Sequence, residues 1–249
     1  MTKSVQDQKD STAVILAAGR GTRLLPHTKD TPKCLLEVAG SPILFHQLSS
    51  LEKSGIMRII VVVGFFAEKV KALTSAAFPH LPVTFVHNPV FETTNTLYSL
   101  ALAAEKITST GSVFLLNGDV VFMPEIIQNL SRRDPEKSFL VISKKKCGNE
   151  EVKIQIAEDG LIVSVNKAID PAIARGEAVG INKFSPGFWG VFSEKLKILK
   201  EGFANEYFEY ALERSISAKN SILPYYIHQN IAMEIDFPDD LKNAKKFLV

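Results

Sequence analysis

The chain has 249 residues, of which 46% are hydrophobic and 22% charged, and a length of this order suits one large α/β domain that needs no disulfide or structural metal to fold. The formal net charge of +2 gives no electrostatic reason to expect nucleic acid or a membrane surface as a partner. The two cysteines, Cys34 and Cys147, match no metal-ligand spacing and are expected to be free thiols in a reducing compartment.

Residues 1–11 are polar and contain no apolar run. We therefore expect them to form a flexible terminus, and not a signal peptide or a membrane anchor. No apolar stretch elsewhere is long enough to cross a bilayer, so the sequence predicts a cytoplasmic protein without a membrane partner. Residues 12–249 are expected to form a single domain.

Apolar runs alternate with helical patterns in the first half of the chain. Short, nearly continuous apolar runs, typical of strands buried on both faces, occupy residues 12–18, 59–64, 83–87 and 113–117. Between them, apolar residues at helical spacing predict helices over 44–51 and 97–104. Strands that alternate with helices favour βαβ crossovers. The sequence thus predicts an α/β fold with a Rossmann-like, mostly parallel sheet flanked by helices on both faces.

The second half of the chain is less regular. Residues 138–143, 153–157 and 161–166 are expected to be strands in a small antiparallel portion, and Asp159-Gly160 is expected to form a hairpin turn between the last two. Helices are expected near 194–199 and 206–217, and a final one begins at Pro238.

A glycine-rich string follows the first expected strand, where open parallel sheets bind ligands. It reads Leu16-Ala17-Ala18-Gly19-Arg20-Gly21-Thr22-Arg23, and Pro32-Lys33 follows. Its small residues let the backbone N–H groups approach an anion closely, while Arg23 and Lys33 can offset charge on a triphosphate or a departing pyrophosphate. For the glycines alone, a plain turn with solvated basic residues is the simpler interpretation. Neither the dinucleotide fingerprint nor the P-loop is present, since Leu24 replaces the third glycine and no GK[ST] occurs.

The full string, LAAGxGTR followed by PK, resembles the signature of the nucleotidyltransferase family that includes sugar-1-phosphate thymidylyltransferases and choline-phosphate cytidylyltransferases. The resemblance implies a GT-A-like nucleotidyltransferase fold in which the glycine loop wraps the NTP phosphates. It implies that Arg23 and Lys33 are catalytic. The implied NTP-binding residues of this loop are Leu16, Ala17, Ala18, Gly19, Gly21 and Thr22.

Two acidic segments follow other expected elements: Asn117-Gly118-Asp119 ends the fourth strand, and Glu234-Ile235-Asp236 precedes the last helix. Carboxylates there could hold Mg²⁺, although Asp119 alone could be a turn residue and Asp236 alone a helix cap. As a pair they match the two metal-binding aspartates of the family. The resemblance therefore implies Asp119 and Asp236 as ligands of a Mg²⁺ cofactor, and Gly118 as part of the NTP site.

The segment from Asn88 to Leu100 resembles the NPxYxxTNxxYSL segment of choline-phosphate cytidylyltransferase-like proteins. Capping of a helix by Thr94 or Asn95 is the alternative interpretation. Thymidylyltransferases usually carry a glycine-rich segment here instead. The resemblance therefore favours CTP, with Asn88, Asn95 and Ser99 in the nucleotide site.

The segment from Glu206 to Leu212 resembles the YYEDAL segment of the same subgroup, with Phe208 for the second Tyr and Tyr210 for the usual Asp. A cationic acceptor binds favourably to a carboxylate and to the faces of aromatic rings. The expected acceptor-binding residues are Lys153, Glu177, Trp189, Tyr207 and Glu209. Packing of this helix into the core, with Glu209 solvated, is the alternative. Phosphocholine and 2-aminoethylphosphonate both fit such a site, and inositol phosphate or a sugar phosphate is the alternative acceptor.

Together these features lead us to expect a Mg²⁺-dependent cytidylyltransferase that moves CMP from CTP to a small phosphorylated or phosphonate acceptor and releases pyrophosphate. Residues 12–135 would mainly bind the NTP, and residues 136–249 mainly the acceptor. No general base is required, because the acceptor is already largely ionised near neutral pH. Two alternatives stay open: a sugar-phosphate or inositol-phosphate nucleotidyltransferase, and a non-catalytic sensor of nucleotide or sugar phosphate on the same fold.

Overall fold

The structure is a computed structural model that describes residues 10–228 and 230–247. The terminus expected to be flexible falls largely on residues 1–9, which lie outside the described residues. Within the described residues, no helix combines the length and the apolar character needed to cross a membrane. Both cysteines are free thiols, as expected.

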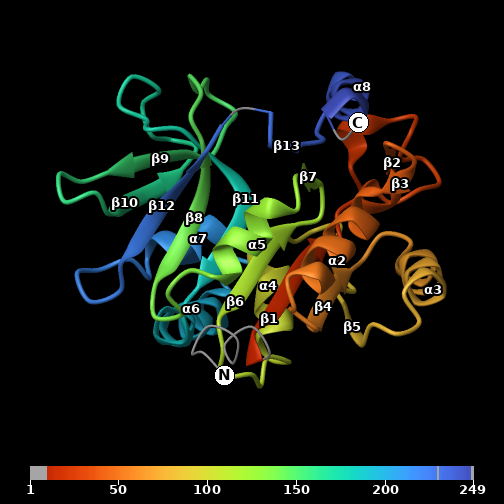
Figure 1. Cartoon of the computed structure of the whole chain (residues 1–249), viewed down its shortest axis with the longest axis horizontal. Helices are drawn as coiled ribbons and strands as arrows, with labels where there is room; N and C mark the ends of the chain where they lie inside the picture. The colour runs from red at the N-terminus through yellow and green to blue at the C-terminus, as the bar shows by residue number, and fades with distance from the viewer. Residues whose placement is uncertain (1–9, 229, 248–249) are drawn as a thin grey trace.

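Helices and strands alternate through the first half of the chain and mix less regularly in the second (Figure 1). The strands are β1 (Thr12–Ala17), β2 (Glu37–Val38), β3 (Ser41–Pro42), β4 (Arg58–Val63), β5 (Val83–His87), β6 (Val113–Asn117), β7 (Val120–Phe122), β8 (Ser138–Ser143), β9 (Lys153–Ile156), β10 (Ile162–Asn166), β11 (Glu177–Phe184), β12 (Ile222–Ile227) and β13 (Ala232–Glu234). The helices are η1 (Thr22–Leu24), η2 (Lys33–Leu35), α2 (Ile43–Lys53), α3 (Ala67–Ala77), α4 (Thr96–Ala104), α5 (Glu125–Ser131), α6 (Pro186–Leu199), α7 (Phe208–Glu213) and α8 (Pro238–Phe247).

One sheet dominates the fold. Among the described residues it has nine strands, and its main path runs β10-β9-β11-β6-β1-β4-β5. The pairs β6–β1, β1–β4 and β4–β5 are parallel, whereas β11 runs antiparallel to β6 and β8. The strand β12 extends the sheet beyond β8 as a parallel neighbour. The mostly parallel sheet predicted from the first half of the sequence is therefore confirmed, and β9 and β10 form the expected antiparallel pair.

Several second-half elements differ from expectation. The helix expected near 194–199 begins earlier, at Pro186, because Ser185 caps its N-terminus by accepting a hydrogen bond from the N–H of Phe188. The helix expected over 206–217 is shorter, because the N–H of Phe208 bonds to the hydroxyl of Thr96 and Tyr207 stays extended. The final helix does begin at Pro238.

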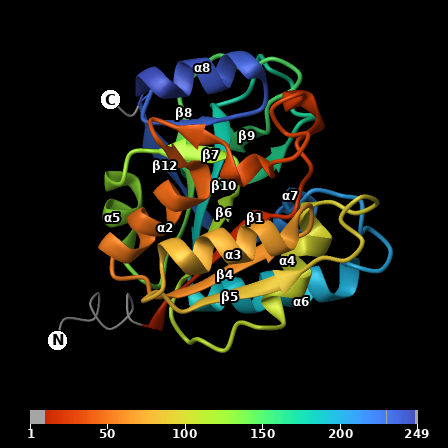
Figure 2. The same ribbon diagram turned by 90° about the vertical axis from the view of Figure 1, so that its right-hand side faces the viewer.

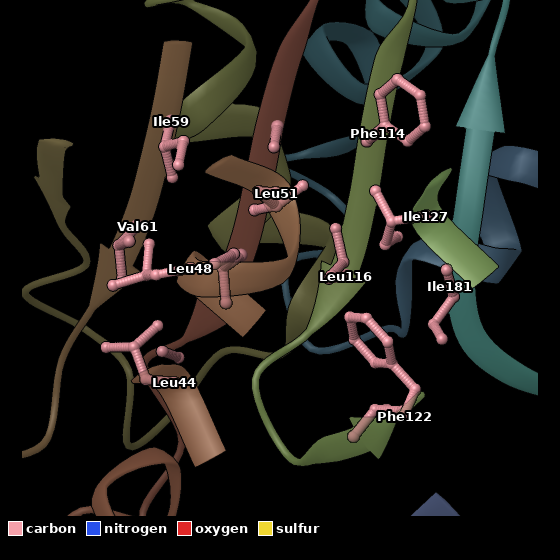
Figure 3. Packing of buried hydrophobic residues seen from close by; sticks show 14 of the residues in the cluster. Leu44, Leu48, Leu51, Ile59, Val61, Phe114, Leu116, Phe122, Ile127 and Ile181 are labelled. Carbon is pink, nitrogen blue, oxygen red and sulfur yellow. The ribbon is translucent and has the colours of Figure 1, made fainter. Parts of the chain in front are cut away.

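One face of the sheet is covered by α2, α3 and α5. In Figure 3, Leu44, Leu48 and Leu51 of α2 point toward the side chains of β4 and β6. These leucines recur at helical spacing and are fully buried, so the α2 stripe predicted from the sequence is the contact surface of the helix. Burial of one such side chain contributes roughly 1.5–3 kcal/mol.

The opposite face is covered by α4, α6 and α7. Their apolar side chains join those of β6, β8 and β11 in a second cluster, which includes a ring stack of Phe184, Phe188, Trp189 and Phe192. Figure 2 shows α6 at the end of the molecule opposite α8. This stack therefore lies away from the edge of the molecule that α8 occupies.

A third, smaller cluster joins the two ends of the chain. Leu24 of η1 packs with Ile43, Val121, Ile235 and Leu241, which come from α2, β7, the segment after β13 and α8. The short pairing of β13 with β7 belongs to the same arrangement. This cluster fixes the loop after β1 against the segment that carries Asp236.

Candidate active site

The loop after β1 is closely packed at one glycine and open at the other. Gly21 has φ +65°, a left-handed conformation that glycine adopts readily, and the Thr28 hydroxyl donates to its carbonyl at 2.7 Å. A Cβ on Gly21 would lie 3.0 Å from Lys33 Cβ, whereas a Cβ on Gly19 would meet nothing. The loop thus packs tightly on the Lys33 side and is open at Gly19, where an anion could approach the backbone.

Four of the expected functional residues meet at one point. The ammonium of Lys33 lies 2.7 Å from Asp119 Oδ2 and 2.6 Å from Asp236 Oδ1. The guanidinium of Arg23 adds an ion pair with Asp236 at 3.5 Å and lies over the ring of Phe237. The structure therefore brings together Arg23, Lys33, Asp119 and Asp236.

The charged groups in this cluster shift one another's pKa values. Burial opposes the charge on Lys33, but the two carboxylates outweigh burial and raise its pKa. Burial likewise opposes the charge on Asp236, but Lys33 and Arg23 lower its pKa below the ordinary value. Both groups are thus charged near neutral pH, and Lys33 acts as the counter-charge of the two aspartates.

The turn between β6 and β7 places Asp119 beside the first strand. The N–H of Gly118 donates to the Leu16 carbonyl at 2.9 Å, and a Cβ on Gly118 would lie only 2.5 Å from that oxygen. Next to it, the amide of Asn117 donates to Glu234 Oε1 at 3.5 Å. Burial, together with Asp119, Glu177 and Asp236, raises the pKa of Glu234 well above its ordinary value. The glycine at 118 is therefore required by close packing at the site.

The segment expected to bind the base is well ordered by its own polar side chains. The buried amide of Asn88 donates to the hydroxyls of Thr94 and Ser99 at 3.0 and 3.1 Å. Asn95 caps α4, with its side-chain oxygen accepting from the N–H of Thr96. Asn88 and Ser99 therefore hold the loop before α4, and Asn95 lies at the tip of that helix.

Two of the residues expected to bind the acceptor lie next to the base segment. The N–H of Phe208 donates to the Thr96 hydroxyl, so α7 begins beside the N-terminus of α4. There Tyr207 is exposed and Glu209 Oε2 is buried without a hydrogen-bond partner among the described residues. Burial raises the pKa of Glu209 to about 7, while the nearby Lys167 opposes the shift. A buried carboxylate oxygen without a partner is costly, so Glu209 is a candidate ligand-binding group.

The other three expected acceptor residues have partners of their own, although Glu177 also acts electrostatically on Glu234. Lys153 is fully buried, and its ammonium donates to the carbonyls of Gly148, Asn149 and Glu151. Glu177 pairs with Lys145 at 2.8 Å. Trp189 belongs to the cluster of aromatic rings that α6 forms with Phe184. The structure does not bring these side chains together with Tyr207 and Glu209.

Three residues near the site were missed by the sequence interpretation. Lys167 lies over the ring of Tyr207 at 5.2 Å and also acts electrostatically on Asp236 and Glu209. Glu234 is buried beside Asn117, and its place two residues before Asp236 could have indicated it. Asn182 is buried in β11, and no sequence signal separates it from an ordinary strand residue.

Comparisons with known proteins identify the family and the fold of this chain. A family model described as "MobA-like NTP transferase domain" matches residues 13–177. CMP-5'-(3-aminopropyl)phosphonate synthase of Streptomyces rubellomurinus is 35% identical over 201 residues, which cover 81% of this chain and 30% of that protein. Choline-phosphate cytidylyltransferase of Streptococcus pneumoniae is 32% identical over 139 residues, covering 55% of this chain and 56% of the relative.

The solved structure of CTP:phosphocholine cytidylyltransferase from Streptococcus pneumoniae superimposes with a TM-score of 0.79 at 22% identity, covering 96% of this chain and 99% of that one. That likeness shows the fold. The chain spans 30% and 56% of the lengths of the two curated relatives above. Since the family model covers well over half of the chain and includes the glycine loop and Asp119, this chain belongs to the family of MobA-like NTP transferase domains.

Proposed function

We propose that this protein transfers CMP from CTP to a small acceptor that carries a phosphate or phosphonate group and a cationic head group, with release of pyrophosphate. The observation that carries the proposal is the meeting of Lys33, Asp119 and Asp236 beside the open glycine loop. This is the edge of a parallel sheet at which nucleotides bind. The relatives named as cytidylyltransferases support CTP over the other NTPs.

The proposed reaction is a displacement at phosphorus. An oxygen of the acceptor anion forms a bond to the α-phosphorus of CTP, and the bond from that phosphorus to the β-bridging oxygen breaks. The electron pair leaves with pyrophosphate, and no proton needs to be removed from the ionised acceptor. Lys33 and Arg23 would offset the charge that develops on the phosphate oxygens, so the barrier is lowered by positioning and electrostatics.

We propose Mg²⁺ as the cofactor, held by Asp119 and Asp236. The residues fit this ion: Asp119 Oδ1 is buried and has no hydrogen-bond partner among the described residues, and both ligands are hard oxygen donors. The described residues contain no group of three or more acidic, His or Cys side chains arranged for a metal. Mg²⁺ is commonly held by one or two carboxylates with phosphate oxygens and water, so a pair suffices. When bound, it would neutralise phosphate charge.

We propose the acceptor end of the site from the charges of Lys167 and Glu209. Lys167 acts electrostatically on both Asp236 and Glu209, so its ammonium lies near both groups. An acceptor with an anionic end near Lys167 and a cationic end at Glu209 would match both groups. The amino or ammonium group of such an acceptor distinguishes it from inositol phosphate and sugar phosphates, which offer hydroxyls only.

The test is pyrophosphate release in the presence of Mg²⁺, with CTP, UTP, ATP and GTP each combined with phosphocholine, 2-aminoethylphosphonate, inositol 1-phosphate and glucose 1-phosphate. We expect release with CTP and at least one aminoalkyl acceptor. Lys33→Met should reduce kcat/KM by more than a hundredfold, because the loss of one preorganised charge at a transferring phosphate typically costs 10²–10³. Lys71→Met, which removes an exposed lysine paired with Glu68 on α3, is the matched control.

Pyrophosphate release only with a sugar or inositol phosphate would support nucleotidyl transfer but contradict the proposal that the acceptor is cationic. Nucleotide binding without release in any combination would contradict the proposal and favour a non-catalytic sensor. Equal activity of Lys33→Met and Lys71→Met would refute the catalytic assignment of Lys33.

A further inference from the structure

A surface hollow of about 990 Å³ lies beside strands β8 and β12. None of the four residues that meet at the candidate active site lines it. Most of its polar lining comes from the loop after β8, from the segment before β11 and from β12: Lys144, Lys145, Lys146, Cys147, Arg175 and Tyr226. Small-molecule sites typically have volumes of roughly 300–1,000 Å³, so this hollow is large enough for a ligand of nucleotide size.

The hollow lies at the same edge of the sheet as the candidate active site. The parallel strands β8 and β12 end together, with Ile227 beside Ser143 (Figure 1). The first residue of β11, Glu177, pairs with the same Ser143. Because β11 runs antiparallel to β6, its start lies toward the end of β6 that leads to Asp119. Ligands of open α/β sheets bind at this edge.

One ion pair joins the hollow to the candidate active site. The ammonium of Lys145 lies 2.8 Å from Glu177 Oε2 and 3.5 Å from Glu151 Oε1. Glu177 in turn acts electrostatically on Glu234, two residues before Asp236. Lys145 is therefore neutralised by carboxylates on the side that faces the site, and the other cations of the hollow remain to be explained.

Those other cations are not matched by acidic groups. Among the described residues, the lining of the hollow contains four basic side chains and no acidic one. Lys146 and Arg175 are exposed, and neither forms an ion pair within the described part of the chain. The ammonium of Lys144 lies over the ring of Tyr226 at 4.3 Å, a contact that positions the charge without neutralising it. Like charges that converge in a hollow concentrate positive potential there, which an anion would relieve.

The backbone of the hollow is held in place by its own hydrogen bonds. The N–H of Ala172 donates to the carboxylate of Asp170 at 2.9 Å, and the N–H of Arg175 donates to the Ile154 carbonyl at 2.9 Å. On the other side, the N–H of Lys145 donates to the Ser143 carbonyl at 3.0 Å. A ligand would thus meet walls that are already formed, which lowers the entropy cost of binding.

We propose that this hollow is a second anion-binding site, which takes a small phosphate-bearing molecule between Lys144, Lys146 and Arg175, with Tyr226 as one wall. Ammonium and guanidinium groups form strong, charge-assisted hydrogen bonds with phosphate oxygens. A phosphate-bearing ligand with two or more negative charges matches the two cations that have no carboxylate partner. The site lies outside the catalytic cluster, so this proposal stands or falls separately from the transfer of CMP.

Cys147 provides a local test, because this half-buried thiol lines the hollow whereas Cys34 is only 2% exposed. The protein is alkylated with uncharged iodoacetamide in the presence of EDTA, and modification of Cys147 is followed by peptide mass spectrometry. Inorganic pyrophosphate is the probe, with sodium chloride holding the ionic strength constant. We expect the alkylation rate to fall along a saturating curve, roughly tenfold when pyrophosphate reaches ten times its Kd. An unchanged rate, or equal slowing by sodium chloride alone, would overturn the proposal.

Two double variants assign the protection to the named cations. Lys146→Gln with Arg175→Gln should raise the midpoint of the protection curve roughly tenfold or more, because each lost charge-assisted hydrogen bond typically costs about that much. Lys53→Gln with Arg58→Gln removes the same charges at exposed positions, where α2 ends and β4 begins, and should keep the wild-type midpoint. Equal midpoints in all three proteins, or equal shifts in both variants, would show that these cations do not form the site. The wild-type curve remains a test even if the first variant fails to fold.

Discussion

Replacing Lys33 with methionine should destabilise the protein in the absence of divalent ions. The substitution removes an ammonium that lies within 2.7 Å of two carboxylates, while the side chains of Asp119 and Asp236 are only 27% and 34% exposed. Removing one partner of a fully buried ion pair costs roughly 3–5 kcal/mol. Because these carboxylates are partly solvated, we expect about 2–3 kcal/mol here, with a fall in Tm of roughly 5–10 °C.

The assay is urea unfolding of Lys33→Met and of the matched control Lys71→Met, with and without millimolar Mg²⁺. Lys71→Met should leave the unfolding midpoint unchanged in both conditions, since its ammonium contacts the exposed Glu68. Mg²⁺ should restore much of the loss in Lys33→Met by replacing the missing positive charge. A loss of less than about 1 kcal/mol, or no response to Mg²⁺, would refute the reasoning that Lys33 is the counter-charge of a cation site.

Three further perturbations have defined outcomes. Gly118→Ala, whose Cβ would lie 2.5 Å from the Leu16 carbonyl oxygen, should cost about 1–3 kcal/mol in thermal unfolding and lower kcat, and unchanged stability would contradict the close packing. Burial raises the pKa of Glu209 to about 7. As pH rises from 4.5 to 7, the free energy of unfolding of the wild type should therefore fall relative to that of Glu209→Gln, by on the order of 3 kcal/mol. A constant difference between the two proteins across this window would show that the carboxyl group is not buried. Lys153→Met should lower stability by about 2–4 kcal/mol, because three backbone carbonyls lose their donor, and weaker acceptor binding at unchanged stability would instead support a direct contact with the acceptor.

The parallel strands could be predicted because their residues are apolar at consecutive positions. Residues 12–17 and 58–63 are apolar at nearly every position, as a strand covered on both faces must be. The strand β11 gives no such pattern, since it contains Gly180, Asn182 and Lys183. Those residues are buried because β11 lies in the middle of the sheet, between β6 and β8, and this depends on pairing with segments far away in the chain.

In the candidate site, too, local features could be predicted from the sequence and long-range contacts could not. The glycine loop is local, so its position after the first strand could be predicted from one string of residues. The contacts of Lys33 with Asp119 and Asp236 span 86 and 203 residues, and only the fold can show them. The resemblance to a family indicated the aspartates, but it gave no indication that Lys153 is tied to the carbonyls of its own loop. Hydrogen bonds of this kind depend on which backbone groups a folded loop leaves unpaired.

The third hydrophobic cluster also bears on when the candidate site can form during synthesis of the chain. It joins η1, which follows the first strand, to α8, which closes the described chain. A ribosome releases the chain from its N-terminus, so the glycine loop and the large sheet can begin to assemble early. Asp236 and α8, which packs with Leu24 of η1, emerge long after the glycine loop. A nascent chain therefore cannot complete the candidate site until α8 has been synthesised.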